Sequence, residues 1–253
     1  MLLAIDAGNT HVKVGVYQGP QLLAKWRMIP ENFGPLDEYG TEVVRLFDRS
    51  GLDAKNVEAI IVASVVPRLN PGLQLMSERY FQLKPSFVDH TTNTGLKLLY
   101  DQPSELGADR IVSAVAAVEK YGVPCIVVDF GTATTFNVIN SQREYLGGII
   151  APGIMTAAEA LFSRAAKLPR VPIERPEKLI GTSTVEAMQS GLFYGYASLV
   201  DGLLRRLMAH DISAPTIVAT GGLAHLMQDA SEFTYQIDEN LTLDGLRIIH
   251  ERA

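Results

Sequence analysis

Two short stretches decide the fold of this chain: residues 2–10, LLAIDAGNT, and residues 125–134, CIVVDFGTAT. Each is an apolar run that ends in Asp-x-Gly and continues into small hydroxyl or amide residues. A second apolar segment follows each copy, at 12–16 and 136–139, as expected for the next strand of a sheet. Glycine after the aspartate lets the chain turn tightly and approach a ligand closely. The two copies lie about half the chain apart, so they predict a duplicated α/β fold whose two turns hold phosphate oxygens and a cation.

The composition is that of a folded protein without a nucleic-acid-binding surface. The chain has 253 residues, 47% of them hydrophobic, and a formal net charge of −6. This allows a large core, and no basic stretch is present to neutralise a nucleic-acid backbone. Cys125 is the only cysteine, which excludes internal disulfides and cysteine-based zinc sites. No apolar run approaches the roughly 20 residues of a membrane helix, and we expect a cytoplasmic protein.

The remaining pattern predicts the order β-β-β-α-β-α in each half. We expect a boundary between residues 115 and 116, which gives domains 1–115 and 116–253, packed closely without a long linker. The expected strands, beyond the two hairpins, are 21–28, 59–65, 85–89 and 217–220. The expected helices are 42–50, 70–81, 109–121, 154–168 and 182–210, with a further helix after Gly221-Gly222. Proline, glycine and acidic residues predict a loop at 30–40, and GGIIAPG predicts a turn-rich element at 147–153.

The first turn has the chemistry of a phosphate site. Asn9 and Thr10 add polar groups beside a run of backbone N–H groups, and Lys13 adds a positive charge. Asp6 would repel phosphate directly, so it would act through Mg²⁺ or its water shell. A plain hairpin turn is an equally good interpretation of one such copy taken alone.

The second copy shifts that balance towards a metal-nucleotide site. Asp129 again ends an apolar strand, where a carboxylate is costly unless it is paired or binds a cation. Thr132, Thr134 and Thr135 add hydroxyl groups directly after it. Neither a P-loop nor a G-x-G-x-x-G turn occurs in the sequence.

A third group of residues, at 107–110 (GADR), opens a predicted helix. An acidic residue there is ordinarily a helix cap or a first-turn residue. Asp109 beside Arg110 also suits a base for a hydroxyl and a donor for a substrate carboxylate or phosphate. The sequence alone leaves both interpretations open.

Taken together, these phrases resemble the type III pantothenate kinases, a family of the acetate and sugar kinase, Hsp70 and actin superfamily. Further matches are the segments 147–153, 168–169, 181–191 and 221–222, in the order of that family and across nearly the whole chain. The resemblance implies two ribonuclease H-like domains with a nucleotide cleft between them. It also implies ATP-dependent phosphorylation of pantothenate, the first step of coenzyme A biosynthesis, by a homodimer that uses Mg²⁺ and a monovalent cation, K⁺ or NH₄⁺.

The resemblance also assigns roles to individual residues. Asp109 is the implied general base, and Asp129 is the implied ligand of the monovalent cation. The implied pantothenate contacts are Tyr100, Gly107, Ala108, Asp109, Arg110 and Thr184. The implied ATP contacts are Asp6, Ala7, Gly8, Asn9, Thr10, His11, Val12, Lys13 and Thr132.

Small departures from the family pattern affect the pocket and not the implied catalytic groups. Ser113 stands where Asn is common, and 181–184 lacks the usual Lys-Asn between Gly and Thr. Two rival functions remain: another kinase of the superfamily with a different acceptor, and a nucleotide-sensing regulator without catalysis. The GADR element and the short chain argue against the first, and retention of Asp6, Asp109, Arg110 and Asp129 argues against the second.

Overall fold

The computed structural model describes residues 1–30, 36–165, 167–210 and 212–253. These form two compact units, Met1–Ala116 with Asn240–Ala253, and Ala117–Glu239. The division differs from the expected domains 1–115 and 116–253 at the C-terminus, where residues 240–253 return to the first unit.

The first unit is built on a five-stranded sheet in the order β3-β2-β1-β4-β5. Strands β1 to β3 are antiparallel neighbours, and β4 and β5 run parallel to β1. The bounds are β1 Leu2–Ala7, β2 Val12–Gln18, β3 Gln21–Met28, α1 Leu36–Arg49, β4 Ala59–Ser64, α2 Asn70–Met76, β5 Ser86–Phe87, β6 Lys97–Leu98 and α7 Leu241–His250. Helix α3, Ala108–Tyr121, begins in this unit and ends in the second. Short 3₁₀ turns lie at Ala54–Asn56, Pro67–Leu69 and Pro103–Glu105.

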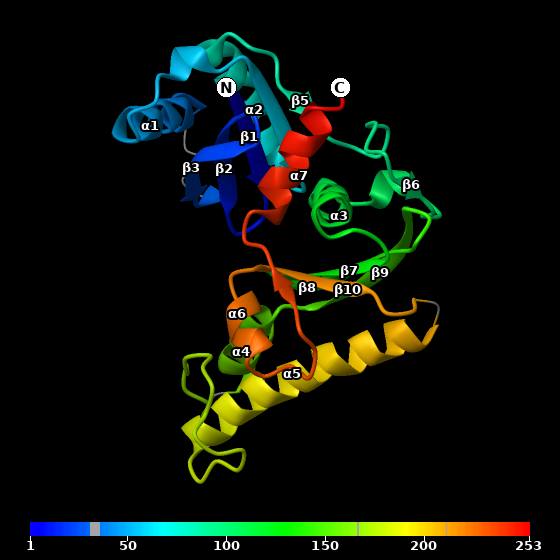
Figure 1. The fold of residues 1–253 in the computed structure, drawn as a ribbon. Coiled ribbons are helices and arrows are strands. Elements are labelled where there is room, and N and C mark those ends of the chain that lie inside the picture. Colours follow the sequence, from blue (N-terminus) through cyan, green and yellow to red (C-terminus); the bar gives the residue numbers. More distant parts are fainter. Residues whose placement is uncertain (31–35, 166, 211) are drawn as a thin grey trace. The chain divides into compact units, whose positions relative to one another are not determined.

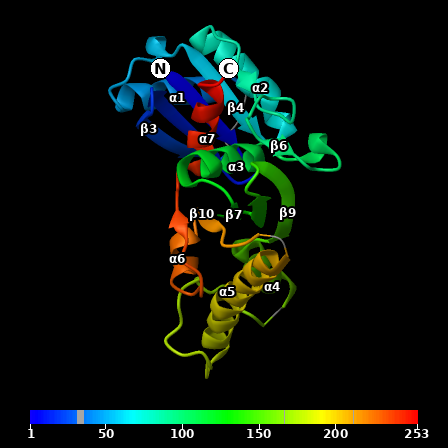
Figure 2. The same ribbon diagram turned by 45° about the vertical axis from the view of Figure 1, so that its right-hand side comes forward.

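Alternation along the strands divides this sheet into two faces. Leu3, Ile5, Val14 and Val16 pack with α1 and α2 in one fully buried core, because every second side chain of a strand points to the same side. The residues between them, including Asp6 and Lys13, lie on the other face. Helix α7 packs on that face, against β1, β2 and β4 (Figures 1 and 2).

The second unit repeats this plan. Its strands lie in the order β11-β10-β7-β8-β9, with β7, β8 and β9 antiparallel and β10 and β11 parallel to β7. The bounds are β7 Cys125–Phe130, β8 Ala133–Ile139, β9 Glu144–Pro152, α4 Ile154–Arg164, α5 Thr184–His210, β10 Thr216–Gly221, α6 Ala224–Gln228 and β11 Gln236–Ile237. Helices α4, α5 and α6 pack on one face of the sheet over a core that includes Phe136, Phe193 and Leu204 (Figures 1 and 2). The duplicated α/β fold is therefore confirmed.

Three expectations about local elements need correction. Helix α1 begins at Leu36, inside the expected 30–40 loop, whose residues 31–35 lie outside the described residues. The 147–153 segment is not a turn, because its residues up to Pro152 pair with β8 and form most of β9. The helix expected at 70–81 is α-helical only to Met76 and continues as a π-helical turn at Ser77–Phe81.

Candidate active site

The first hairpin holds Asp6 and Lys13 together. The two residues are direct partners in the β1–β2 register, and Lys13 Nζ lies 3.3 Å from Asp6 Oδ2. Asp6 is buried, whereas Asn9 and Thr10 are exposed at the tip of the turn. The Gly8 N–H donates to the His11 carbonyl at 3.0 Å and closes the turn. The carboxylate is thus held at the base of a loop whose tip is open to a ligand.

The donor set at Asp6 fits a divalent cation that is held mainly by a nucleotide. Mg²⁺ in kinase sites commonly uses one or two protein carboxylates and takes its other ligands from phosphates and water. Asp6 supplies one carboxylate, and no group of three or more His, Cys, Asp or Glu residues with metal-site geometry occurs in the part of the chain that the structure describes. The described residues therefore do not form a metal site in which the protein supplies all the ligands.

The pKa of His11, in this turn, is lowered by its surroundings. Burial lowers the pKa of its imidazole, and the nearby charges of Arg27 and Lys13 lower this pKa further. A neutral imidazole is therefore favoured beside two cations.

The second hairpin is braced against the start of α4. The Thr132 carbonyl accepts hydrogen bonds from the Gly153 N–H at 3.0 Å and from Thr156 Oγ1 at 2.7 Å. A Cβ at Gly153 would lie 2.4 Å from the Gly131 carbonyl oxygen, so only glycine permits this approach. The N-terminus of an 11-residue helix, with its unpaired N–H groups and positive dipole end, is thereby fixed beside the turn.

Asp129 lies in an oxygen-rich part of the second sheet. Its register partners are Thr135 on β8 and Thr220 on β10, so the three side chains share one face. Thr220 is 1% exposed, and its Oγ1 has no hydrogen-bond partner among the described residues. A Cβ at Gly221 would lie 2.7 Å from Asp129 Oδ1, which places that carboxylate against the β10 backbone. A carboxylate with hydroxyl oxygens beside it fits a hard cation.

Asp109 occupies the first turn of α3, where its Oδ1 accepts the Arg110 N–H at 2.8 Å. A Cβ at Gly107 would lie 2.5 Å from the same oxygen, so glycine makes room for this orientation. Ser113 Oγ donates to the Asp109 carbonyl at 2.6 Å. Arg110 is buried. Asp109 is therefore a first-turn residue of the helix, and its carboxylate satisfies an N–H group of that turn.

The other expected site residues are distributed over both units. Tyr100 is half-buried after β6 in the first unit, and Thr184 is exposed at the first position of α5 in the second. Glu186 accepts hydrogen bonds from the Thr182 and Ser183 N–H groups just before Thr184, and these bonds, from Thr182 first, lower the pKa of its carboxyl. The structure brings Asp6 together with Lys13, and Gly107 with Asp109. Sequence reasoning missed Thr156 and Thr220, which only strand register and tertiary hydrogen bonds reveal.

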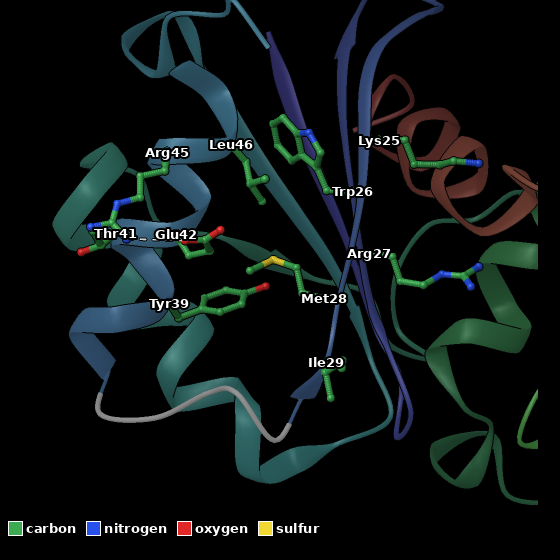
Figure 3. A pocket seen from close by; sticks show the side chains of 10 residues that line it. All are labelled: Lys25, Trp26, Arg27, Met28, Ile29, Tyr39, Thr41, Glu42, Arg45 and Leu46. Atoms are coloured by element: carbon green, nitrogen blue, oxygen red, sulfur yellow. Dashed lines mark ion pairs between the residues drawn. The ribbon is translucent and has the colours of Figure 1, made fainter. Parts of the chain in front are cut away.

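A hollow of about 1090 Å³ lies between β3 and α1, away from these residues. Figure 3 shows Trp26 and Met28 on the side of β3 that faces α1, with Tyr39 opposite them. Lys25 and Arg27 point to the other side of the same strand. The hollow therefore opens on the apolar face of the first sheet, and the Asp6 side chain lies on the opposite face.

Comparison with known proteins identifies the family. The family model for type III pantothenate kinase matches residues 2–206. The type III pantothenate kinase of Anaeromyxobacter sp. (strain Fw109-5) is 52% identical over 252 residues, covering 100% of this chain and 99% of the relative. That of Halalkalibacterium halodurans is 48% identical over 252 residues with the same coverage. This chain belongs to the type III pantothenate kinase family.

Solved structures outside the family share the fold of this pantothenate kinase family member. The activator of 2-hydroxyisocaproyl-CoA dehydratase from Clostridium difficile, with bound ADPNP, has a TM-score of 0.58 at 12% identity and covers 99% of this chain and 94% of its own. The ROK hexokinase of Thermus thermophilus has a TM-score of 0.51 at 16% identity and covers 98% of this chain and 97% of its own. The two-unit α/β architecture is that of actin-like ATPases and sugar kinases. No helix among the described residues is long and apolar enough to span a membrane.

Proposed function

We propose that this chain transfers the γ-phosphoryl group of ATP to the primary hydroxyl of pantothenate, the first step of coenzyme A biosynthesis. The observation that carries the proposal is the match to relatives of this name over 100% of the chain at about half identity. As a member of that family the chain is a kinase. The side chains at the two hairpins and at the start of α3 would supply the chemistry that such a transfer needs.

The ATP phosphates would bind at the first turn, Asp6 to Lys13, with Thr132 as a contact from the second turn. In-line phosphoryl transfer depends on positioning and charge neutralisation more than on covalent chemistry. The exposed residues Asn9 and Thr10 and the Lys13 ammonium support this role. Mg²⁺, with Asp6 as its protein ligand, would neutralise phosphate charge when bound.

Asp109 would accept the proton of the pantothenate hydroxyl. The Arg110 N–H fixes one carboxylate oxygen at 2.8 Å, which orients the group for proton transfer. Gly107, Ala108, Arg110, Tyr100 and Thr184 would contact pantothenate, with the Arg110 guanidinium suited to an anionic group. These residue roles are proposals that rest on the family resemblance and on the local geometry at α3.

A monovalent cation, K⁺ or NH₄⁺, would be held by Asp129. The register partners Thr135 and Thr220 support this assignment, because hydroxyl oxygens are suitable ligands and the buried Thr220 Oγ1 lacks a described partner. When bound, the cation would supply positive charge near the transferring group. Titration of activity with KCl, with NaCl at equal ionic strength as the control, tests the assignment.

A homodimer is the proposed assembly, and α5 offers a surface for it. A Cβ placed at Gly191, Gly195 or Gly202 would have no atom within 4 Å, so a second helix could approach this side closely. Val185 and Leu199 are exposed on the same helix. Sedimentation of wild type and Gly195→Glu tests the surface: the variant should shift towards monomer with its thermal stability retained, and an unchanged dimer would exclude this face.

One assay separates the proposed activity from its rivals. Purified protein is incubated with ATP, Mg²⁺ and K⁺, and ADP release is followed with and without pantothenate. We expect ADP release that depends on pantothenate, with phosphopantothenate identified by mass. Release with acetate or a sugar instead would indicate another kinase of the superfamily, and ATP binding without release would indicate a nucleotide sensor.

A further inference from the structure

Strand β3 carries a cation that the assigned site residues do not include. Asp6 pairs with Lys13 across β1 and β2, and Lys13 pairs with Arg27 across β2 and β3. Register partners share one face of a sheet, so the three charged side chains form a row. Figure 3 agrees, since Arg27 points to the side of β3 opposite Trp26 and Met28.

This row is unfavourable unless an anion joins it. Like charges directly opposite one another on adjacent strands destabilise a sheet. Asp6, with its Oδ2 3.3 Å from Lys13 Nζ, supplies one negative charge for two cations. Arg27 is exposed, and no described residue forms an ion pair or hydrogen bond with its guanidinium. Burial is the main reason why the pKa of His11 is lowered, and the charges of Arg27 and Lys13 lower this pKa further.

The position of the row indicates which anion would bind there. Lys13 is the second residue of β2, so the row lies at the end of the sheet where the first turn begins. That turn is the part of the chain proposed to hold the ATP phosphates. Places where a sequence breaks a local rule without internal compensation are typical of functional sites. Guanidinium groups suit phosphate because they donate two parallel hydrogen bonds.

We propose that Arg27 binds the triphosphate of ATP together with Lys13. The inference rests on the proposed function and adds a residue to its nucleotide site. The positive charge of Lys13 compensates the negative charge of Asp6. The positive charge of Arg27 has no such counter-charge in the row and can therefore bind the phosphates of the nucleotide. Both cations then lie against phosphate in the complex, where their mutual repulsion is compensated.

The test uses Arg27→Gln and Arg27→Lys, with Lys25→Gln as the matched control. Lys25 lies on the same strand and face, is exposed, and donates to Asn240 Oδ1 at 2.7 Å. Titration calorimetry with ATP and with ADP should show binding weakened about tenfold or more in Arg27→Gln, as for loss of a charged hydrogen bond. Arg27→Lys should restore part of the loss, and Lys25→Gln should stay within about twofold of wild type because its charge lies two residue pairs further from the turn.

Two further readouts separate phosphate binding from a structural role. Arg27→Gln should melt no lower than wild type without nucleotide, since a repulsion is removed, yet ATP should raise its melting temperature less. The affinity of Arg27→Gln for pantothenate should stay within about twofold of wild type, because the carboxylate of pantothenate would bind elsewhere, at Arg110.

Wild-type affinity for ATP in Arg27→Gln would overturn the proposal, as would an equal loss in Lys25→Gln. Weakened pantothenate binding with normal ATP binding would assign Arg27 to the acceptor and also overturn it. Wild-type protein that binds ATP but does not phosphorylate pantothenate would contradict the proposed function, and the calorimetry would still decide the role of Arg27.

Discussion

The two hairpins of this protein have the same strand order but different neighbours beside their aspartates. In the first sheet, the row through Asp6 continues into Lys13 and Arg27. In the second sheet, the equivalent row through Asp129 continues into Thr135 and Ile150. On the other side of the aspartate, the first sheet has Ala63 and the second has Thr220. One scaffold thus presents fixed cations in one copy and hydroxyl groups in the other.

The difference indicates a division of labour. Fixed ammonium and guanidinium groups suit a polyanion such as triphosphate, because they donate charged hydrogen bonds to its oxygens. A carboxylate between threonine hydroxyls suits a diffusible cation, which the oxygens can coordinate. Neither row contains the proposed base, Asp109, which lies in a third element, α3. The two units thus share one kind of turn, and the side chains in the rows differ between them.

The largest effect on turnover is expected at Asp109, which lies outside both hairpins. It tests whether the base is separate from the two compared rows. Asp109→Asn should lower kcat by about 10²–10⁴, because proton transfer by a positioned base contributes this much. The KM values should change less, and the melting temperature should remain close to that of wild type. Asp48→Asn, an exposed change on α1, is the control. A folded Asp109→Asn variant with normal turnover would contradict the base role.

Gly221→Ala should strain the pairing of β10 with β7 beside the second hairpin and leave the first hairpin unchanged. A Cβ there would lie 2.5 Å from the Phe130 carbonyl oxygen and 2.7 Å from Asp129 Oδ1, at a φ of +95°. We expect a loss of about 2 kcal/mol or more in unfolding free energy, from strain and overpacking. Gly222→Ala is the matched control, since its Cβ would meet nothing within 4 Å. Denaturant unfolding measures both, and equal stability of the two variants would contradict the packing described.

Gly107→Ala should affect turnover more than stability. The new methyl would lie 2.5 Å from Asp109 Oδ1 and 3.3 Å from Val65 Cγ1, so the carboxylate must move. We expect kcat to fall about tenfold, because misplacing a catalytic group is costly, with a stability change below about 1 kcal/mol. Unchanged kcat would mean that the orientation of Asp109 seen here does not matter for turnover.

The smallest expected effect is the contribution of His11, in the first turn, to the pH dependence of stability. The folded pKa of His11 lies below its ordinary value, so the folded state binds fewer protons than the unfolded state as pH falls below about 6.5. Stability should therefore decline from about pH 6.5 downwards by this contribution. Bound ATP should raise the pKa of His11, because phosphate offsets the charges of Arg27 and Lys13. Imidazole NMR titration with and without ATP measures this shift, with His225 in the second unit as the internal control, and an unchanged or lower His11 pKa would contradict the account.

Much of the fold followed from local pattern, whereas the exceptions depended on tertiary packing. Strand β3 was predicted with its observed bounds, since its apolar and polar residues and flanking turns are local signals. Helix α7 was not predicted, and neither was the return of residues 240–253, which contain it, to the first unit, because an apolar helix does not encode which sheet it will cover. Strand β9 was mistaken for a turn, because pairing with β8 overrides the turn preference of its glycines.

The site shows the same division between local and distant information. Asp6, Asp109 and Asp129 could be selected from their motifs, because each ends a strand or starts a helix. Arg27 and Thr220 could not, because their relation to these aspartates depends on strand register. The register of β2 and β3 also shifts between Val16 and Tyr17, which sequence alternation does not reveal. Residues that act across strands thus become visible only when the strands are paired.

The most direct test of the unequal hairpins compares Asp6→Asn with Asp129→Asn in the pantothenate-dependent release of ADP. Activity is titrated with ATP–Mg²⁺ at saturating K⁺, and with K⁺ at saturating ATP, keeping ionic strength constant with NaCl. We expect Asp6→Asn to raise the KM for ATP–Mg²⁺ by about tenfold or more, and Asp129→Asn to raise the half-maximal K⁺ concentration by a similar factor, as for loss of one charged ligand. Equal shifts of both constants in both variants, or no K⁺ dependence in wild type, would contradict this expectation.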